Sequence, residues 1–157
     1  MKDYTNIKAT LKKHHESLDE LKNHKVIQNK KDFTSQIGEW FVSELYGGTR
    51  AQSGIQKDWD IIVSESYIQV KTHSKAITTK ARWSVIKKNY DAKINVLIIV
   101  VFTENYKLRE FYKLPWEDAY RLITSQKSRD VIHWDHLNKY KINIEELPNQ
   151  SVVSLFK

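Results

Sequence analysis

The chain has 157 residues, of which 40% are hydrophobic and 29% charged, and 26 Lys and Arg against 19 Asp and Glu give a formal net charge of +7. This length predicts one domain, residues 1–157, with a core large enough to be stable alone, and the composition argues against a membrane protein or a disordered chain. No cysteine is present, which excludes disulfide scaffolds, Cys-ligated metal centres and thiol nucleophiles. The longest apolar run, residues 96–102, is too short to cross a membrane, so we expect a cytoplasmic protein without a membrane partner.

The positive charge is concentrated in two segments. Residues 1–31 carry eight basic and four acidic residues, and residues 71–93 carry seven basic residues against Asp91 alone. Trp83 and Tyr90 lie among the bases of the second segment, which suits a nucleic-acid contact, although a solvated surface with Trp83 in the core explains the pattern as well. The excess of positive charge favours a polyanion such as DNA, or an acidic surface, as the partner.

Residues 4–23 are predicted to form an amphipathic helix, because apolar residues and one histidine recur three or four positions apart. This stripe consists of Tyr4, Ile7, Leu11, His14, Leu18 and Leu21. We expect this N-terminal helical extension, residues 1–31, to pack on the domain with His14 at the edge of the contact rather than as a ligand. The same stripe is a candidate contact for a homodimer.

A second helix is predicted over residues 34–45, with Thr34 as its N-cap and a double glycine as its stop signal. Glu39 lies well off the apolar stripe of this helix. Glu44 falls within the stripe, so it lies either at the rim of the core or buried with a partner.

After the double glycine the hydrophobic period changes to that of strands. The predicted strands are residues 49–52, a hairpin of 59–63 and 67–72 with its turn at 64–66, a central buried strand at 96–102, and its neighbour at 108–114. A helix should begin at Pro115. Residues 80–90 are ambiguous, with a helical turn before Asp91, and residues 131–134 and 142–147 form a mixture without a clear order.

Polar residues interrupt this pattern at specific places. Asp60 lies inside an apolar strand, and period-2 alternation puts Gln69 and Lys71 on one face of the next strand. The hairpin can bring Asp60 beside them, and a bound cation or a lysine would offset the cost of burying its carboxylate. With Glu39 these residues form the minimum set for phosphodiester hydrolysis, which needs a hard cation and a positive group near the developing charge.

This order resembles the PD-(D/E)xK nuclease superfamily, the restriction-endonuclease-like fold. The matching pieces are residues 38–40, 58–63 and 68–72, so the resemblance covers about residues 34–102. It implies an α/β fold with a central mixed β-sheet flanked by helices, here with an extra N-terminal helix, a nuclease-like core over 34–114, and a C-terminal helix and tail over 115–157. It also implies a metal-dependent endodeoxyribonuclease that uses Mg²⁺, with Mn²⁺ as an alternative.

The resemblance also assigns roles to the four site residues. Asp60 is the metal-ligand aspartate, Lys71 the catalytic lysine, and Glu39 the supporting carboxylate, also near the metal. Gln69 stands where the motif has Asp or Glu, a variant found in active members such as Mrr-like restriction enzymes, and its amide oxygen replaces a carboxylate oxygen at the metal. No proline precedes Asp60, and Asp58 competes with Asp60 for the ligand role.

Polar and basic residues that follow the motif are candidates for contact with nucleic acid, and a polar strand end on a solvated surface is the alternative. These candidates are His73, Ser74, Lys75, Lys80, Arg82, Lys87 and Lys88. His133, Asp135 and His136 match no metal-binding spacing and are interpreted as structural.

Two other functions stay open on the sequence. One is a nucleic-acid-binding module that kept the fold and lost catalysis, which Gln69 makes conceivable. The other is an interaction protein whose basic surface binds an acidic protein. Target recognition is not encoded in any motif of the chain.

Overall fold

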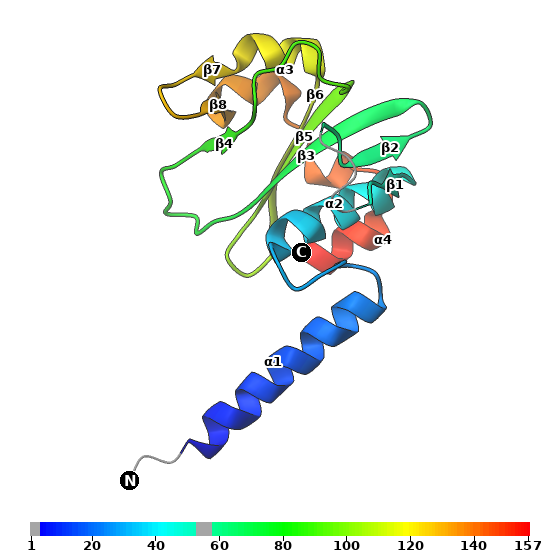
Figure 1. Cartoon of the computed structure of the whole chain (residues 1–157), viewed down its shortest axis with the longest axis vertical. Coiled ribbons are helices and arrows are strands. Elements are labelled where there is room, and N and C mark those ends of the chain that lie inside the picture. Colours follow the sequence, from blue (N-terminus) through cyan, green and yellow to red (C-terminus); the bar gives the residue numbers. More distant parts are fainter. Residues whose placement is uncertain (1–3, 53–57) are drawn as a thin grey trace.

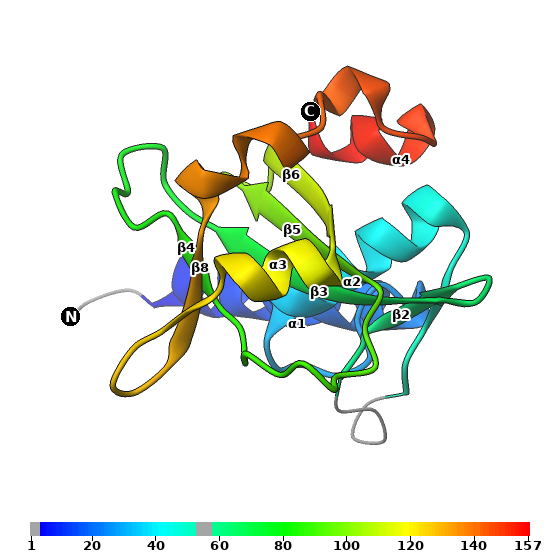
Figure 2. The ribbon, with the colours of Figure 1, turned by 90° about the horizontal axis from the view of Figure 1, so that it is seen from above.

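The computed structural model describes residues 4–52 and 58–157, which form a mixed α/β architecture (Figures 1 and 2). Its larger sheet has the strand order β1-β2-β3-β5-β6, with β3 and β5 parallel and the other neighbours antiparallel. A smaller antiparallel sheet has the order β4-β8-β7. The strands are Thr49–Arg50 (β1), Ile61–Val63 (β2), Ser66–Ser74 (β3), Trp83–Val85 (β4), Val96–Phe102 (β5), Leu108–Pro115 (β6), Thr124–Ser125 (β7) and Asp130–His133 (β8).

Helices cover both faces of the larger sheet. The helices are Thr5–Asn23 (α1), Phe33–Tyr46 (α2), Trp116–Leu122 (α3) and Gln150–Val153 (α4), and the 3-10 helices are Trp134–Tyr140 (η1), Ile144–Glu146 (η2) and Ser154–Phe156 (η3). On β5, Ile98 packs with Phe41 of α2, whereas Ile99 packs with Trp134 of η1 on the other face. The expectation of a buried central strand at 96–102 is therefore confirmed.

The predicted hairpin is also confirmed. Ile61 of β2 pairs with Ile68 of β3, and the turn between the strands contains Ser64 with a positive φ of 53°. Strand β2 begins at Ile61 rather than at residue 59, so Asp60 lies immediately before it.

Helix α2 begins one residue earlier than the sequence predicts, and its N-cap prediction is wrong. The cap is Asp32, whose carboxylate accepts a hydrogen bond from the Ser35 N–H. The hydroxyl of Thr34 is engaged elsewhere, at 2.8 Å from the hydroxyl of Tyr106. Glu44 is exposed, so it lies at the rim rather than in the core.

The ambiguous segment 80–90 contains a strand rather than a helical turn. Strand β4 pairs with β8, and Ser84 lies opposite Ile132. Residues 131–134 accordingly divide between β8 and η1. The helix after Pro115 is confirmed as α3, with Trp116 and Ala119 buried.

Helix α1 extends away from the rest of the molecule in Figure 1. Its predicted bounds are confirmed to within one residue, but none of its residues is buried. The expectation that its apolar stripe packs on the domain is therefore wrong. None of the described helices is long and apolar enough to cross a membrane.

Candidate functional site

Asp60 is fixed beside the β2–β3 hairpin by its own backbone. Its N–H donates to the carbonyl of Ile68 at 2.9 Å, and its carbonyl accepts from the N–H of Ala51 at 2.7 Å. These bonds extend the ladder between β1, β2 and β3 by one residue. The carboxyl group is therefore held at the point where the hairpin begins.

Gln69 and Asp60 contact each other directly. Gln69 Nε2 donates to Asp60 Oδ2 at 2.6 Å, and the N–H of Val70 donates to the same oxygen at 2.7 Å. Asp60 Oδ1 accepts no hydrogen bond from the residues that the structure describes. One carboxylate oxygen is thus held by the hairpin, and the other is available to a ligand.

Glu39 and Asp60 line the same cleft, which has a volume of about 270 Å³. Burial and, after it, the neighbouring charge of Asp60 raise the pKa of Glu39 to about 7. Burial also raises the pKa of Asp60, although the Val70 N–H and the Lys71 ammonium oppose this effect. Within 4–52 and 58–157, the carboxyl group of Glu39 makes no hydrogen bond or ion pair. The two carboxyl groups together favour a proton or a cation in the cleft.

A close contact between α2 and β3 positions Glu39 near the hairpin. A Cβ atom on Gly38 would lie 1.8 Å from Thr72 Oγ1, a distance that no side chain tolerates. Glycine therefore allows α2 to approach β3 more closely than any other residue would. Since Glu39 is the next residue, this approach sets its position.

Lys71 and Gln69 line a second, smaller cavity of about 160 Å³, together with Asp58. Asp58 accepts a hydrogen bond from the N–H of Lys93 at 3.2 Å and is not among the residues that line the cleft of Glu39. The ammonium of Lys71 has no ion pair or hydrogen bond with any described residue, although its charge acts on both Glu39 and Asp60. The four predicted site residues thus occupy two cavities, which the contact between Asp60 and Gln69 joins.

His73 is partly buried between the two sheets. Its Nε2 lies 2.7 Å from Ser84 Oγ, and its ring centroid lies 4.9 Å from that of Trp134. Burial and, after it, the charges of Lys75 and Lys71 lower the pKa of His73 to about 4. The imidazole is therefore neutral at pH 7.

Several other residues predicted to contact nucleic acid are bonded within the protein. Ser74 Oγ donates to the carbonyl of Thr103, and Lys75 Nζ donates to that of Ala81 at 2.8 Å. Lys88 Nζ donates to the carbonyl of Ile123 at 2.9 Å.

Lys80 and Lys87 are different, because both are exposed and neither forms an ion pair within the described part of the chain. Lys87 also lines the cavity of Gln69 and Lys71.

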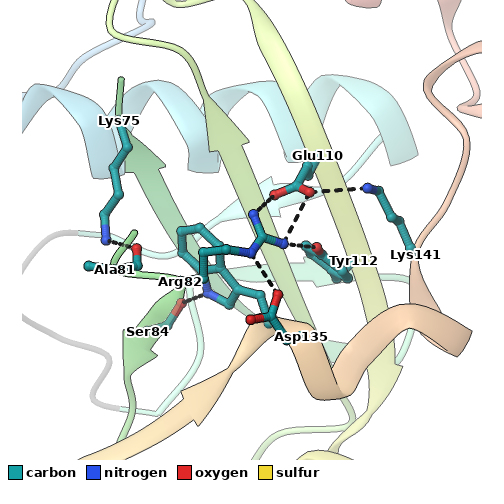
Figure 3. A network of polar contacts seen from close by, with 9 residues as sticks. Lys75, Ala81, Arg82, Ser84, Glu110, Tyr112, Asp135 and Lys141 are labelled. Carbon is teal, nitrogen blue, oxygen red and sulfur yellow. Dashed lines mark hydrogen bonds and ion pairs between the residues drawn. The ribbon is translucent and has the colours of Figure 1, made fainter. Parts of the chain in front are cut away.

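Arg82 belongs to a network around the buried carboxylate of Glu110 that joins β4 to β6 and η1 (Figure 3). Its guanidinium donates to both carboxylate oxygens of Glu110, at 2.9 and 3.2 Å, and to Asp135 at 2.7 Å. Lys141 Nζ adds a bond to Glu110 at 3.1 Å. Burial acts to raise the pKa of Glu110, but the bonds from Arg82 and Lys141 outweigh it and hold the pKa below its ordinary value. Asp135 accepts a bond from Arg82 within this network, in agreement with its interpretation as a structural residue.

The sequence did not single out Gln28, Asn29 and Gln36, which also line the cleft, or Arg50, whose charge acts on Glu39. Gln36 Oε1 accepts from the N–H of Gln28 at 2.6 Å and of Asn29 at 3.1 Å, which folds this segment against α2. Arg50 donates to the carbonyls of Lys25 and Val26, and its charge opposes the rise in the pKa of Glu39. No motif marks these residues, because their partners are set by the tertiary fold.

No protein-family model matches the chain, and a search of curated proteins found no match. Within the described residues no group of three or more His, Cys, Asp or Glu side chains is arranged to hold a metal ion. The case for a function therefore depends on Asp60, Glu39, Gln69 and Lys71 themselves.

Proposed function

We propose that this chain is a metal-dependent endodeoxyribonuclease with a restriction-endonuclease-like core. The observation that carries the proposal is the direct contact of Asp60 with Gln69, beside a second carboxyl group, Glu39, in the same cleft. The mixed sheet, with its β2–β3 hairpin and the covering helix α2, agrees with the order of elements in that superfamily.

The residues at the cleft fit a hard divalent cation such as Mg²⁺, with Mn²⁺ as an alternative. Asp60 offers Oδ1, Glu39 offers a carboxyl group without a hydrogen bond among the described residues, and Gln69 offers an amide oxygen. Oxygen ligands of this kind are those that Mg²⁺ prefers. When bound, the ion supplies Lewis acidity toward a phosphate oxygen and lowers the pKa of a bound water.

The side chains have distinct roles in this proposal. Gln69 donates from Nε2 to Asp60 Oδ2. Because an amide NH₂ group is a donor only, the side-chain amide must rotate by about 180° before Oε1 can bind a cation. Glu39 must lose its proton before it can act as a ligand, and its pKa of about 7 makes this step sensitive to pH. Lys71 places an unpaired positive charge beside the cleft, where it stabilises negative charge that develops on the phosphate.

Contact with DNA is proposed for two exposed lysines, Lys80 and Lys87, of which Lys87 lines the cavity of Gln69 and Lys71. Lys80 and Lys87 are free to neutralise phosphates, whereas Lys75, Arg82 and Lys88 are bonded within the protein. Fewer phosphate contacts imply a shallower salt dependence of binding than the seven bases of residues 71–93 suggest.

The test is a cleavage assay on supercoiled plasmid, branched and single-stranded DNA with Mg²⁺ or Mn²⁺. Asp60→Asn and Lys71→Ala should each reduce cleavage by about 100-fold or more, since each removes a group that contacts the metal or the reacting phosphate. Lys107→Ala, a change at an exposed turn lysine, is the matched control and should cleave like the parent.

A second readout separates metal binding from activity. Titration calorimetry with Mn²⁺ should detect a site in the parent that is lost in Asp60→Asn. Cleavage that is unchanged in both Asp60→Asn and Lys71→Ala would overturn the assignment of the site.

A nucleic-acid-binding module without catalysis is the second candidate. The observation in its favour is that the amide NH₂ group of Gln69, rather than a carboxylate, faces Asp60. Salt-sensitive DNA binding without cleavage, across all metals and DNA forms in the assay, would support this candidate.

A further inference from the structure

Helix α1 carries an apolar stripe whose N-terminal half is exposed, whereas Leu18 and Leu21 are half-buried where the chain turns at the end of the helix. Tyr4, Ile7 and Leu11 are 62%, 55% and 58% exposed, and no residue of α1 is buried. Figure 1 shows the helix extending from the body of the molecule. An isolated helix of this length is only marginally stable in water, so a partner that covers the stripe would stabilise it.

The spacing of the stripe specifies the kind of partner. Its six residues are separated by three, four, three, four and three positions, which is the a/d spacing of a heptad repeat. Tyr4, Leu11 and Leu18 occupy a positions, and Ile7 and Leu21 occupy d positions with His14. A seam this narrow fits another helix in a coiled coil, whereas a helix that packs on a globular core presents a wider apolar face.

The charges beside the seam distinguish two ways in which identical helices pair. The e positions hold the basic residues Lys8, His15 and Lys22, whereas the g positions Thr10 and Ser17 are neutral. In an antiparallel pair e positions face e positions, so bases would face bases. In a parallel pair e positions face g positions, so Lys22 lies beside Ser17 of the other copy. The parallel arrangement avoids the repulsion.

We propose that two copies of this chain associate through α1 as a parallel, in-register coiled coil. His14 would then face its counterpart in the seam, and a polar residue at such a position fixes the register at a cost in stability. Because the seam spans only about two and a half heptads, the dimer is weak and its population depends on concentration.

Parallel pairing has a consequence for the cleft. The segment that follows α1 supplies Gln28, Asn29 and Lys31 to the lining of the cleft. Two parallel helices end together, so both clefts lie at the same end of the coiled coil. An antiparallel pair would separate the two ends by about 28 Å, the length of 19 helical residues.

The experiment is sedimentation equilibrium of the full chain over a concentration series up to millimolar, without nucleic acid. The parent should shift from monomer to dimer as concentration rises. The double variant Ile7→Asp/Leu11→Asp should raise the dissociation constant by about 100-fold or more, because it puts charges into the seam. Ala9→Asp places the same new charge at an exposed position on the opposite side of α1 and should dimerise like the parent.

Orientation is tested by an engineered disulfide, since the natural chain has no cysteine. Ile7→Cys should form a covalent dimer on mild oxidation, because parallel in-register pairing places the two copies of position 7 side by side. A parent chain that stays monomeric at every concentration would overturn the proposal, as would a dimer that persists in Ile7→Asp/Leu11→Asp. Failure of Ile7→Cys to form a covalent dimer would overturn the parallel, in-register arrangement. None of these readouts depends on nuclease activity, so the dimer and the proposed function fail separately.

Discussion

Gln69 donates a hydrogen bond to Asp60 at the open end of the β2–β3 hairpin, just beyond the pair of Ile61 and Ile68, with Nε2 and Oδ2 2.6 Å apart. In the proposed nuclease site, a neutral donor therefore stands where the PD-(D/E)xK motif has a carboxylate. Because Asp60 already shares its cleft with Glu39, a third carboxylate would crowd negative charge in a partly buried place. Gln69 relieves that repulsion in the metal-free protein and retains an oxygen for a cation.

Gln69→Glu should make stability depend strongly on divalent metal. Without metal the variant loses the bond to Asp60 and adds a like charge, so we expect a loss of about 1–3 kcal/mol in the free energy of unfolding. Saturating Mg²⁺ should recover most of this loss, because an added carboxylate binds the cation more tightly. Thermal unfolding with and without Mg²⁺ measures both effects. Gln126→Glu, at an exposed turn, should show neither, and equal unfolding temperatures of Gln69→Glu and parent would contradict the prediction.

Glu39→Gln should stabilise the metal-free protein, and more so at high pH. The pKa of Glu39 is about 7 in the folded protein against an ordinary 4.5, so the folded state binds more protons between these values. Stability due to this group is therefore present at low pH and falls as pH rises through 7. We expect a gain of about 1–3 kcal/mol at about pH 8 and a much smaller one near pH 4.5.

Urea denaturation at the two pH values measures this difference. Glu65→Gln, at an exposed position in the hairpin turn, is the matched control and should change stability equally at both. A gain in Glu39→Gln that is the same at both pH values would show that the raised pKa is not its cause.

Glu110→Gln should destabilise the protein through the network of Figure 3. Glu110 is 7% exposed and accepts bonds from Arg82 and Lys141, so its replacement leaves Lys141 without an anion among the described residues and Arg82 with Asp135 alone. We expect a loss of about 2–3 kcal/mol, measured by urea denaturation. Glu117→Gln removes an exposed ion pair with Arg121 and should cost only about 0.5 kcal/mol or less. Similar losses in the two variants would contradict a structural role for the network around Glu110.

The sequence predicts contacts between residues that are close together in the chain, but not the distant partners of Arg82. The hairpin, α2 and β5 follow from local periodicity, and the contact of Asp60 with Gln69 follows from the hairpin, because their partners lie within ten residues. Arg82 instead pairs with Glu110, 28 positions away, and with Asp135, 53 positions away. No local pattern marks such partners.

The internal bonds of the basic segment could not be predicted for the same reason. Lys75 and Lys88 count as surface charge in the sequence, but backbone carbonyls of the fold accept their hydrogen bonds. Strand β4 depends on β8, which lies more than forty residues further along the chain.

Gly38→Ala should disturb the site without changing any of its side chains. The added methyl group would meet Thr72 Oγ1 at 1.8 Å, so α2 must move away from β3 and take Glu39 with it. We expect a loss of about 1–3 kcal/mol in unfolding free energy and weaker Mn²⁺ binding by calorimetry. Thr72→Gly removes the atoms that obstruct the methyl group, so the loss caused by Gly38→Ala should be smaller in a Thr72→Gly background than in the parent. Equal losses in both backgrounds, with Mn²⁺ affinity unchanged, would show that the closeness of α2 to β3 does not set the position of Glu39.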